Sequence, residues 1–70
     1  MEDEIRKGKY QHYKGDFYEV ICLANHSENG EDLVIYQSLK DKKIWARPKS
    51  MFLENIVIDG VETSRFRFVG

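Results

Sequence analysis

The residues best suited to molecular recognition are Trp45, the only tryptophan of the chain, and Arg47, two positions later. Alternate side chains of a strand point to opposite faces, so we expect these two to share one face while Ile44 and Ala46 point inward. A flat indole beside a forked guanidinium can stack on bases, bind a proline-rich peptide or surround a cation. The alternative is that the arginine only packs over the indole.

Other aromatic residues can extend this surface. Tyr10, Tyr36 and Trp45 are the ones we expect to be partly exposed, with Tyr13 and Tyr18 as further members. A short chain must also fill its core with large side chains, so packing explains many of these rings equally well.

A second candidate site consists of His26, Glu28 and Glu31, which surround the turn residues Asn29 and Gly30. A histidine with two carboxylates can bind a metal or transfer protons, which makes a metal-dependent or acid–base enzyme one alternative. The sequence has no third strong ligand, and the Pro-Cys-x-x-Cys of zinc deaminases is absent. We therefore expect His26 and Glu28 to hydrogen-bond backbone groups of their own loop, without a metal or cofactor.

Short runs of β-forming residues between turn signals must position these side chains. We expect strands over residues 9–13, 17–25, 32–39, 44–47, 54–58 and 64–69, with a helical turn over 49–52. Pro48 ends the fourth strand, because proline lacks the N–H that a continuing ladder requires.

The strand over residues 17–25 is apolar on both faces. Strict alternation places Tyr18, Val20, Cys22 and Ala24 on one face and Phe17, Ile21 and Leu23 on the other. A homodimer that buries the second face is therefore a third alternative. We also predict that Met51 and Phe52 plug the core and that Phe66 and Phe68 point inward.

Turn signals every eight to twelve residues and the lack of helical periodicity predict an all-β fold. We expect a small SH3-like barrel of five to six short antiparallel strands, with one helical turn before strand five. An OB-like barrel is the alternative, although it requires a longer helix.

Composition narrows the possible partners. The 70 residues carry a net charge of −1, and the sequence pI of about 6.1 is low for a nucleic-acid-binding protein. Residues 1–35 carry four basic and eight acidic side chains, and residues 36–70 carry seven basic and four acidic ones. Nucleic acid is thus a weaker expectation than a peptide or protein partner.

The ends and the single cysteine suggest where the protein is found. Residues 1–7 are mostly charged and predict a disordered leader before one β-barrel domain over 8–70. No apolar segment has the length of a membrane span or signal-peptide core, so we expect no membrane association. Cys22 has no disulfide partner, which favours the cytoplasm.

The chain resembles a family of small, often stand-alone bacterial domains known as domain of unknown function 1653. Three blocks carry the resemblance: residues 8–20, residues 24–28, and Trp45-Ala46-Arg47-Pro48 with Met51-Phe52-Leu53-Glu54. It implies a compact β fold with no assigned activity and supplies no catalytic residues. Our prediction is a non-catalytic binding or adaptor module that uses the aromatic and arginine patch; the oligomeric state, monomer or homodimer, stays open.

Overall fold

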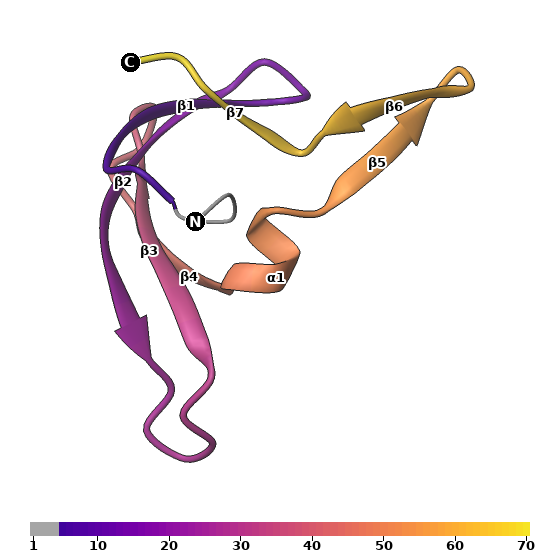
Figure 1. Cartoon of the computed structure of the whole chain (residues 1–70). Helices are drawn as coiled ribbons and strands as arrows, with labels where there is room; N and C mark the ends of the chain where they lie inside the picture. Colours follow the sequence, from indigo (N-terminus) through magenta and orange to yellow (C-terminus); the bar gives the residue numbers. More distant parts are fainter. Residues whose placement is uncertain (1–4) are drawn as a thin grey trace.

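A computed structural model of the chain describes residues 5–70, which form an all-β fold with one short helix. Its elements in chain order are β1 (Gly8–His12), β2 (Phe17–Asn25), β3 (Asp32–Ser38), β4 (Ile44–Pro48), α1 (Lys49–Phe52), β5 (Asn55–Ile58), β6 (Val61–Ser64) and β7 (Phe66–Phe68). One antiparallel sheet has the order β4-β3-β2-β1-β7, and β5 and β6 form a separate two-stranded sheet. Figure 1 shows that α1 faces the concave side of the larger sheet and that the β5–β6 hairpin extends away from this sheet.

The prediction of an all-β fold is confirmed, but the number of strands is not. The expected last strand over residues 64–69 is two strands, because Arg65 interrupts the pairing. Its backbone N–H donates to the Glu54 carbonyl, and its own carbonyl accepts from the Tyr13 N–H. Strands β4 and β7 are the edges of an open sheet, an arrangement consistent with the SH3-like interpretation. The helix that the OB-like alternative needs is absent from residues 5–70, where α1 has four residues.

The core is built from aromatic rings between the larger sheet and α1. Phe52, which is 1% exposed, stacks on Phe66 with ring centroids 4.3 Å apart. Among the residues that the structure describes, the core comprises Ile5, Tyr10, Val20, Val34, Tyr36, Phe52 and Phe66. The predicted plug is thus half right, because Phe52 fills the core whereas Met51 is 46% exposed. Phe66 is buried as expected. Phe68 points to the same face, opposite Tyr10, but lies at its rim and is 36% exposed.

The core also reaches into the segment expected to be a leader. Ile5 is 7% exposed and belongs to the core, and the Arg6 carbonyl accepts a hydrogen bond from the Tyr10 hydroxyl. The part of the expected leader over residues 1–4 lies outside the residues that the structure describes. Packing of the described chain therefore begins at Ile5.

A β-bulge in β2 corrects the predicted assignment of its faces. Val20 is opposite Tyr36, but Cys22 is opposite Ile35, so the register shifts by one residue at Ile21. Since directly opposed residues share a face, Cys22 and Ala24 lie on the outer face, and Leu23 shares the core face with Val34. The apolar set Phe17, Ile21 and Leu23 that suggested a homodimer is therefore not one continuous surface.

The faces of β4 are the reverse of the prediction. Trp45 is opposite Tyr36 and Arg47 is opposite Val34, which places both on the core side of the sheet. Ile44 and Ala46 take the outer face, where Ile44 is 62% exposed. The alternation was predicted correctly, but its inner and outer sides were exchanged.

Within residues 5–70, no helix is both long and apolar enough to cross a membrane.

Candidate functional site

Three of the six predicted site residues, Tyr36, Trp45 and Arg47, line one concavity at the β4 edge of the core face. The concavity has a volume of about 410 Å³, within the range of small ligand sites. The described residues that line it are Asp16, Tyr18, Tyr36, Ser38, Lys40, Asp41, Trp45 and Arg47. The sheet thus brings together strands β2, β3 and β4 with the two turns that flank them.

Arg47 lies between this concavity and the core. Its Nε donates a hydrogen bond to the Tyr36 hydroxyl at 3.3 Å, and its Cζ lies 6.0 Å from the centroid of the Phe66 ring. Among residues 5–70, its terminal nitrogens form no hydrogen bond or ion pair. Among residues 5–70, the side chain is therefore fixed at Nε, and a guanidinium held in this way can offer its terminal donors to an anionic ligand.

Trp45 stands at the mouth of the concavity, where 49% of it is exposed. The β3–β4 turn that precedes it is well ordered by hydrogen bonds. The buried Ser38 Oγ accepts from the Lys40 N–H at 3.2 Å, and the Asp41 carboxylate accepts from the Lys43 N–H at 3.0 Å. Lys42 adopts a positive φ of 66°, which closes the turn. These hydrogen bonds order the backbone of the turn that leads into Trp45.

The opposite wall of the concavity is polar. Burial raises the pKa of the Tyr18 hydroxyl, and the negative charge of Asp16 raises it further, so this hydroxyl stays protonated at neutral pH. The hydrogen bond from the Lys43 N–H lowers the pKa of Asp41, which remains a carboxylate. Within residues 5–70, two acidic and two basic side chains line the cavity, so it can offer both kinds of charge to a ligand.

Tyr10 and Tyr36 are buried, which corrects the prediction that both are partly exposed. Tyr36 is 5% exposed and contributes its hydroxyl to the floor of the concavity. Tyr10 is 7% exposed and packs edge-on against Phe52 and Phe68, with centroids 5.4 and 5.3 Å apart. Tyr10 therefore supports the core and does not line the concavity.

His26 and Glu28 lie at the other end of the sheet, in the β2–β3 loop. The His26 Nδ1 accepts a hydrogen bond from the Glu28 N–H at 3.1 Å, which confirms the prediction that His26 binds backbone within its loop. Within residues 5–70, no group of three or more His, Cys, Asp or Glu side chains is arranged to hold a metal. His12 and His26 are separated by the length of β2, roughly 25–30 Å for nine residues, and they share no site.

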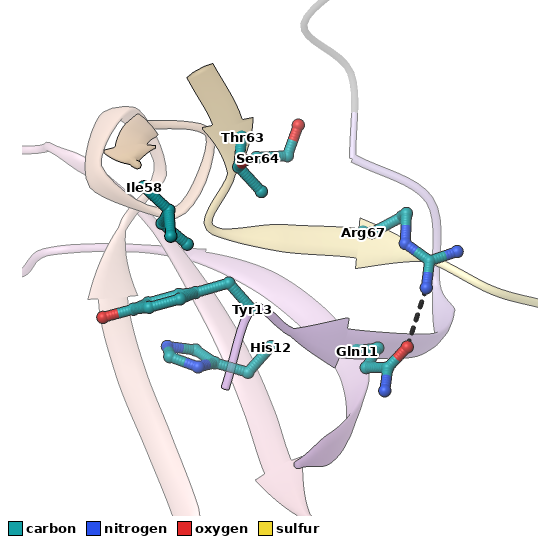
Figure 2. Close-up of a pocket in the computed structure, with 7 residues that line it drawn as sticks. All are labelled: Gln11, His12, Tyr13, Ile58, Thr63, Ser64 and Arg67. Atoms are coloured by element: carbon teal, nitrogen blue, oxygen red, sulfur yellow. Dashed lines mark hydrogen bonds between the residues drawn. The ribbon is translucent and has the colours of Figure 1, made fainter. Parts of the chain in front are cut away.

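A second concavity, of about 300 Å³, was not anticipated from the sequence. The described residues that line it come from β1, the turn after β1, β7 and the β5–β6 hairpin: Gln11, His12, Tyr13, Ile58, Thr63, Ser64 and Arg67. Figure 2 shows the Tyr13 ring lying over His12 and the 2.7 Å hydrogen bond from Arg67 to Gln11 on the far side.

The electrostatics of this second concavity centre on His12. Its Nδ1 accepts from the Lys14 N–H at 3.2 Å. Burial lowers the pKa of His12, and the positive charges of Arg65, Lys14 and Arg47 lower it further. His12 is therefore a neutral hydrogen-bonding group at physiological pH.

Most of the residues that complete the two concavities carry no local sequence signal. Ser38 and Asp41 are ordinary turn residues, and their place beside Trp45 depends on how β3 and β4 pair. The β5–β6 residues approach β1 only because β7 returns to pair with it. Turn chemistry could have identified Ser38 as a fixed group, but strand order was needed for the rest.

Fold and site together define a small all-β domain with an aromatic and arginine concavity at a sheet edge. The family model described as protein of unknown function DUF1653 matches residues 8–68, and the chain belongs to this family. A crystal structure of a DUF1653 protein from Bordetella bronchiseptica is similar, with a TM-score of 0.88 and 31% sequence identity. The similarity covers 96% of this chain and 90% of that one. Comparison with curated proteins finds no match.

Proposed function

We propose that this chain is a non-catalytic binding or adaptor module, and that the concavity beside Trp45 and Arg47 holds a segment of its partner. The observation that carries the proposal is that Trp45 and Arg47, which alternate on β4, line one cavity together with Tyr36 from β3. The indole offers a flat surface to an apolar or aromatic group. The terminal nitrogens of the guanidinium can donate to an anion.

The rigidity of the site supports the same function. Tyr36 contacts Tyr18, Phe52 and Phe66, with centroids 5.4 to 5.6 Å apart, so the floor is part of the core. A preformed site loses little conformational entropy when it binds a ligand. The indole, guanidinium and tyrosine hydroxyl that line the site are groups that proteins use in recognition.

The experiment is selection of ligands from random short peptides and from random single-stranded oligonucleotides, followed by calorimetry with the enriched ligand. We expect Trp45→Ala and Arg47→Gln each to weaken binding at least about tenfold, the loss typical of a central interface residue. Arg67→Gln is the matched control, because Arg67 is an exposed arginine on β7 outside this concavity. Binding that is equal in the parent, Trp45→Ala and Arg47→Gln would refute the proposal.

We also propose that the protein works in the cytoplasm. Cys22, its only cysteine, is a free thiol on the outer face of the sheet. A domain this small that works outside the cell is usually stabilised by disulfides. Fractionation of bacterial cells that express the chain from its own gene tests this, and recovery in the periplasm would contradict it.

A further inference from the structure

The open edge of β4 is the strongest unexplained feature of the fold. Among residues 5–70, β4 pairs only with β3 in the five-stranded sheet, and Ile44, Trp45 and Ala46 are all exposed. No hydrogen bond to the backbone of Ile44 or Ala46 from outside the β3–β4 ladder occurs among residues 5–70. Natural sheets usually cover or interrupt an edge of this kind.

The hydrogen-bond pattern shows which backbone groups the edge presents. The Ser38 N–H donates to the Lys43 carbonyl at 2.9 Å, so this pair is hydrogen-bonded. Hydrogen-bonded and non-hydrogen-bonded pairs alternate in an antiparallel ladder, which makes Tyr36–Trp45 hydrogen-bonded and Ile35–Ala46 not. The N–H and carbonyl groups of Ile44 and Ala46 therefore point away from β3, toward the open edge.

The side chains beside this edge are those of the proposed site. A strand added next to β4 places its alternate side chains on the core face, directly opposite Trp45 and Arg47. These are non-hydrogen-bonded positions with respect to the added strand, where opposed side chains lie closest. The edge would supply main-chain affinity and the concavity would supply specificity.

We infer that the edge of β4 binds an extended peptide as an additional antiparallel strand, with an acidic side chain at Arg47 and an apolar one at Trp45. This inference rests on the function proposed above. An antiparallel peptide, followed from its N-terminus, passes Arg47 first and Trp45 second. In the peptide sequence the acidic residue therefore precedes the apolar one by two positions.

Charge favours this partner over a second copy of the chain. Residues 40–49 contain five basic side chains and one acidic side chain, a net charge of +4 in a chain whose total is −1. Two β4 edges paired with each other would bring these basic segments together, which is unfavourable. A peptide with an acidic residue complements the same segment.

The backbone favours a peptide over nucleic acid. Strand addition uses N–H and carbonyl groups in a peptide's own spacing, and a nucleotide chain has no equivalent ladder. Asp16 and Asp41 line the concavity and would repel a phosphate backbone that carries one charge per nucleotide.

The decisive variant is Ala46→Pro. Proline removes the Ala46 N–H that faces the edge, is tolerated on edge strands and leaves the side chains of Trp45 and Arg47 in place. Short random peptides are selected against the parent chain, and we expect the enriched sequences to share the acidic–x–apolar pattern. The best peptide should bind Ala46→Pro about tenfold more weakly, and bind the matched control Ala46→Ser like the parent.

A chemical control on the peptide tests the same contact without changing the protein. An N-methyl group on the residue opposite Ala46 should weaken binding as Ala46→Pro does. An N-methyl group on the residue opposite Trp45 should leave binding unchanged, because that amide points away from β4.

The outcomes separate this inference from the function on which it rests. If Ala46→Pro binds the peptide fully and Trp45→Ala does not, strand addition is overturned but the proposed binding module stands. If Trp45→Ala binds the peptide fully, both strand addition and the proposed binding module are refuted. Three other outcomes also overturn the inference. The selection enriches oligonucleotides but no peptide, it enriches neither, or the parent self-associates and Ala46→Pro abolishes this self-association.

Discussion

Arg47 Nε donates a hydrogen bond to the hydroxyl of Tyr36 at 3.3 Å, and this contact joins the candidate site to the core. Tyr36 is 5% exposed, and its ring packs edge-on against the Phe52 and Phe66 pair. The guanidinium is therefore oriented by a residue that cannot move without disturbing the core. An arginine fixed in this way recognises an anion with a defined geometry.

Removing the Tyr36 hydroxyl tests this contact. We expect Tyr36→Phe to lower the free energy of unfolding by about 0.5–1.5 kcal/mol, because the hydrogen bond to Arg47 is lost and the ring stays in place. Urea denaturation followed by circular dichroism measures the change. Tyr13→Phe is the control, since the Tyr13 hydroxyl has no hydrogen bond among residues 5–70. Equal stability of parent and Tyr36→Phe would show that the contact contributes nothing.

The short helix α1 should stabilise the fold through one side chain. Phe52→Ala removes a ring that is 1% exposed and stacks on Phe66, so we expect a loss of about 3–5 kcal/mol. Met51→Ala, at an adjacent residue that is 46% exposed, should change stability by less than about 1 kcal/mol. Thermal unfolding of both variants gives the comparison, and similar losses would contradict the assignment of Phe52 as the core residue of α1.

Alanine substitutions at two glycines, Gly8 and Gly15, distinguish the cost of a steric clash from the cost of backbone strain. Gly8 has φ +137°, and a Cβ there would lie 3.0 Å from the Phe68 ring, whereas Gly15 has φ +108° with open space around it. Both alanine variants should lose about 1–2 kcal/mol through the positive φ. Gly8→Ala should lose more, because the Phe68 ring must also move. Denaturant titration decides, and a smaller loss in Gly8→Ala than in Gly15→Ala would be inconsistent with this packing.

His12 should make the protein less stable in mild acid. Its folded pKa lies below the ordinary value of 6.5, so the unfolded chain binds a proton more readily. The stabilising contribution is fully present above the unfolded pKa and is lost as the pH falls toward the folded pKa. We expect the urea midpoint to decrease between about pH 7 and pH 5, and His12→Gln to show a shallower decrease. Parallel pH profiles in the two proteins would exclude His12 as the cause.

Much of the fold was predictable because turn residues mark the ends of its strands. The bounds of β2 and α1 agree with the prediction, since Gly15 and the Asn29-Gly30 pair delimit β2, and Pro48 stops β4 before α1. Both glycines adopt the positive φ that their turns require. Local chemistry of this kind needs no knowledge of strand order.

The faces of the strands were harder to predict. β2 is apolar on both sides, so alternation gave no sign of the bulge at Ile21 that exchanges its faces. In β4 both candidate faces contain apolar residues, and only the pairing of Trp45 with Tyr36 shows which one meets the core. The break at Arg65 depends on partners in two distant segments, at Tyr13 and Glu54.

The site was predictable in part for the same reason. Trp45 and Arg47 alternate on one strand, so their shared face follows from the sequence. The cavity wall from Tyr18 and Asp41 depends on the register between strands. Tyr10 and Tyr36 could not be ranked by exposure before the sheet order was known.

The most direct test of the binding function is an NMR titration of the parent chain with the best selected peptide. We expect the indole N–H signal of Trp45 and the Nε–H signal of Arg47 to shift with the same binding curve. The loop signals of His26 and Glu28, at the other end of β2, should stay unchanged. A peptide that binds while the Trp45 and Arg47 signals do not move would show that this concavity is not the binding site.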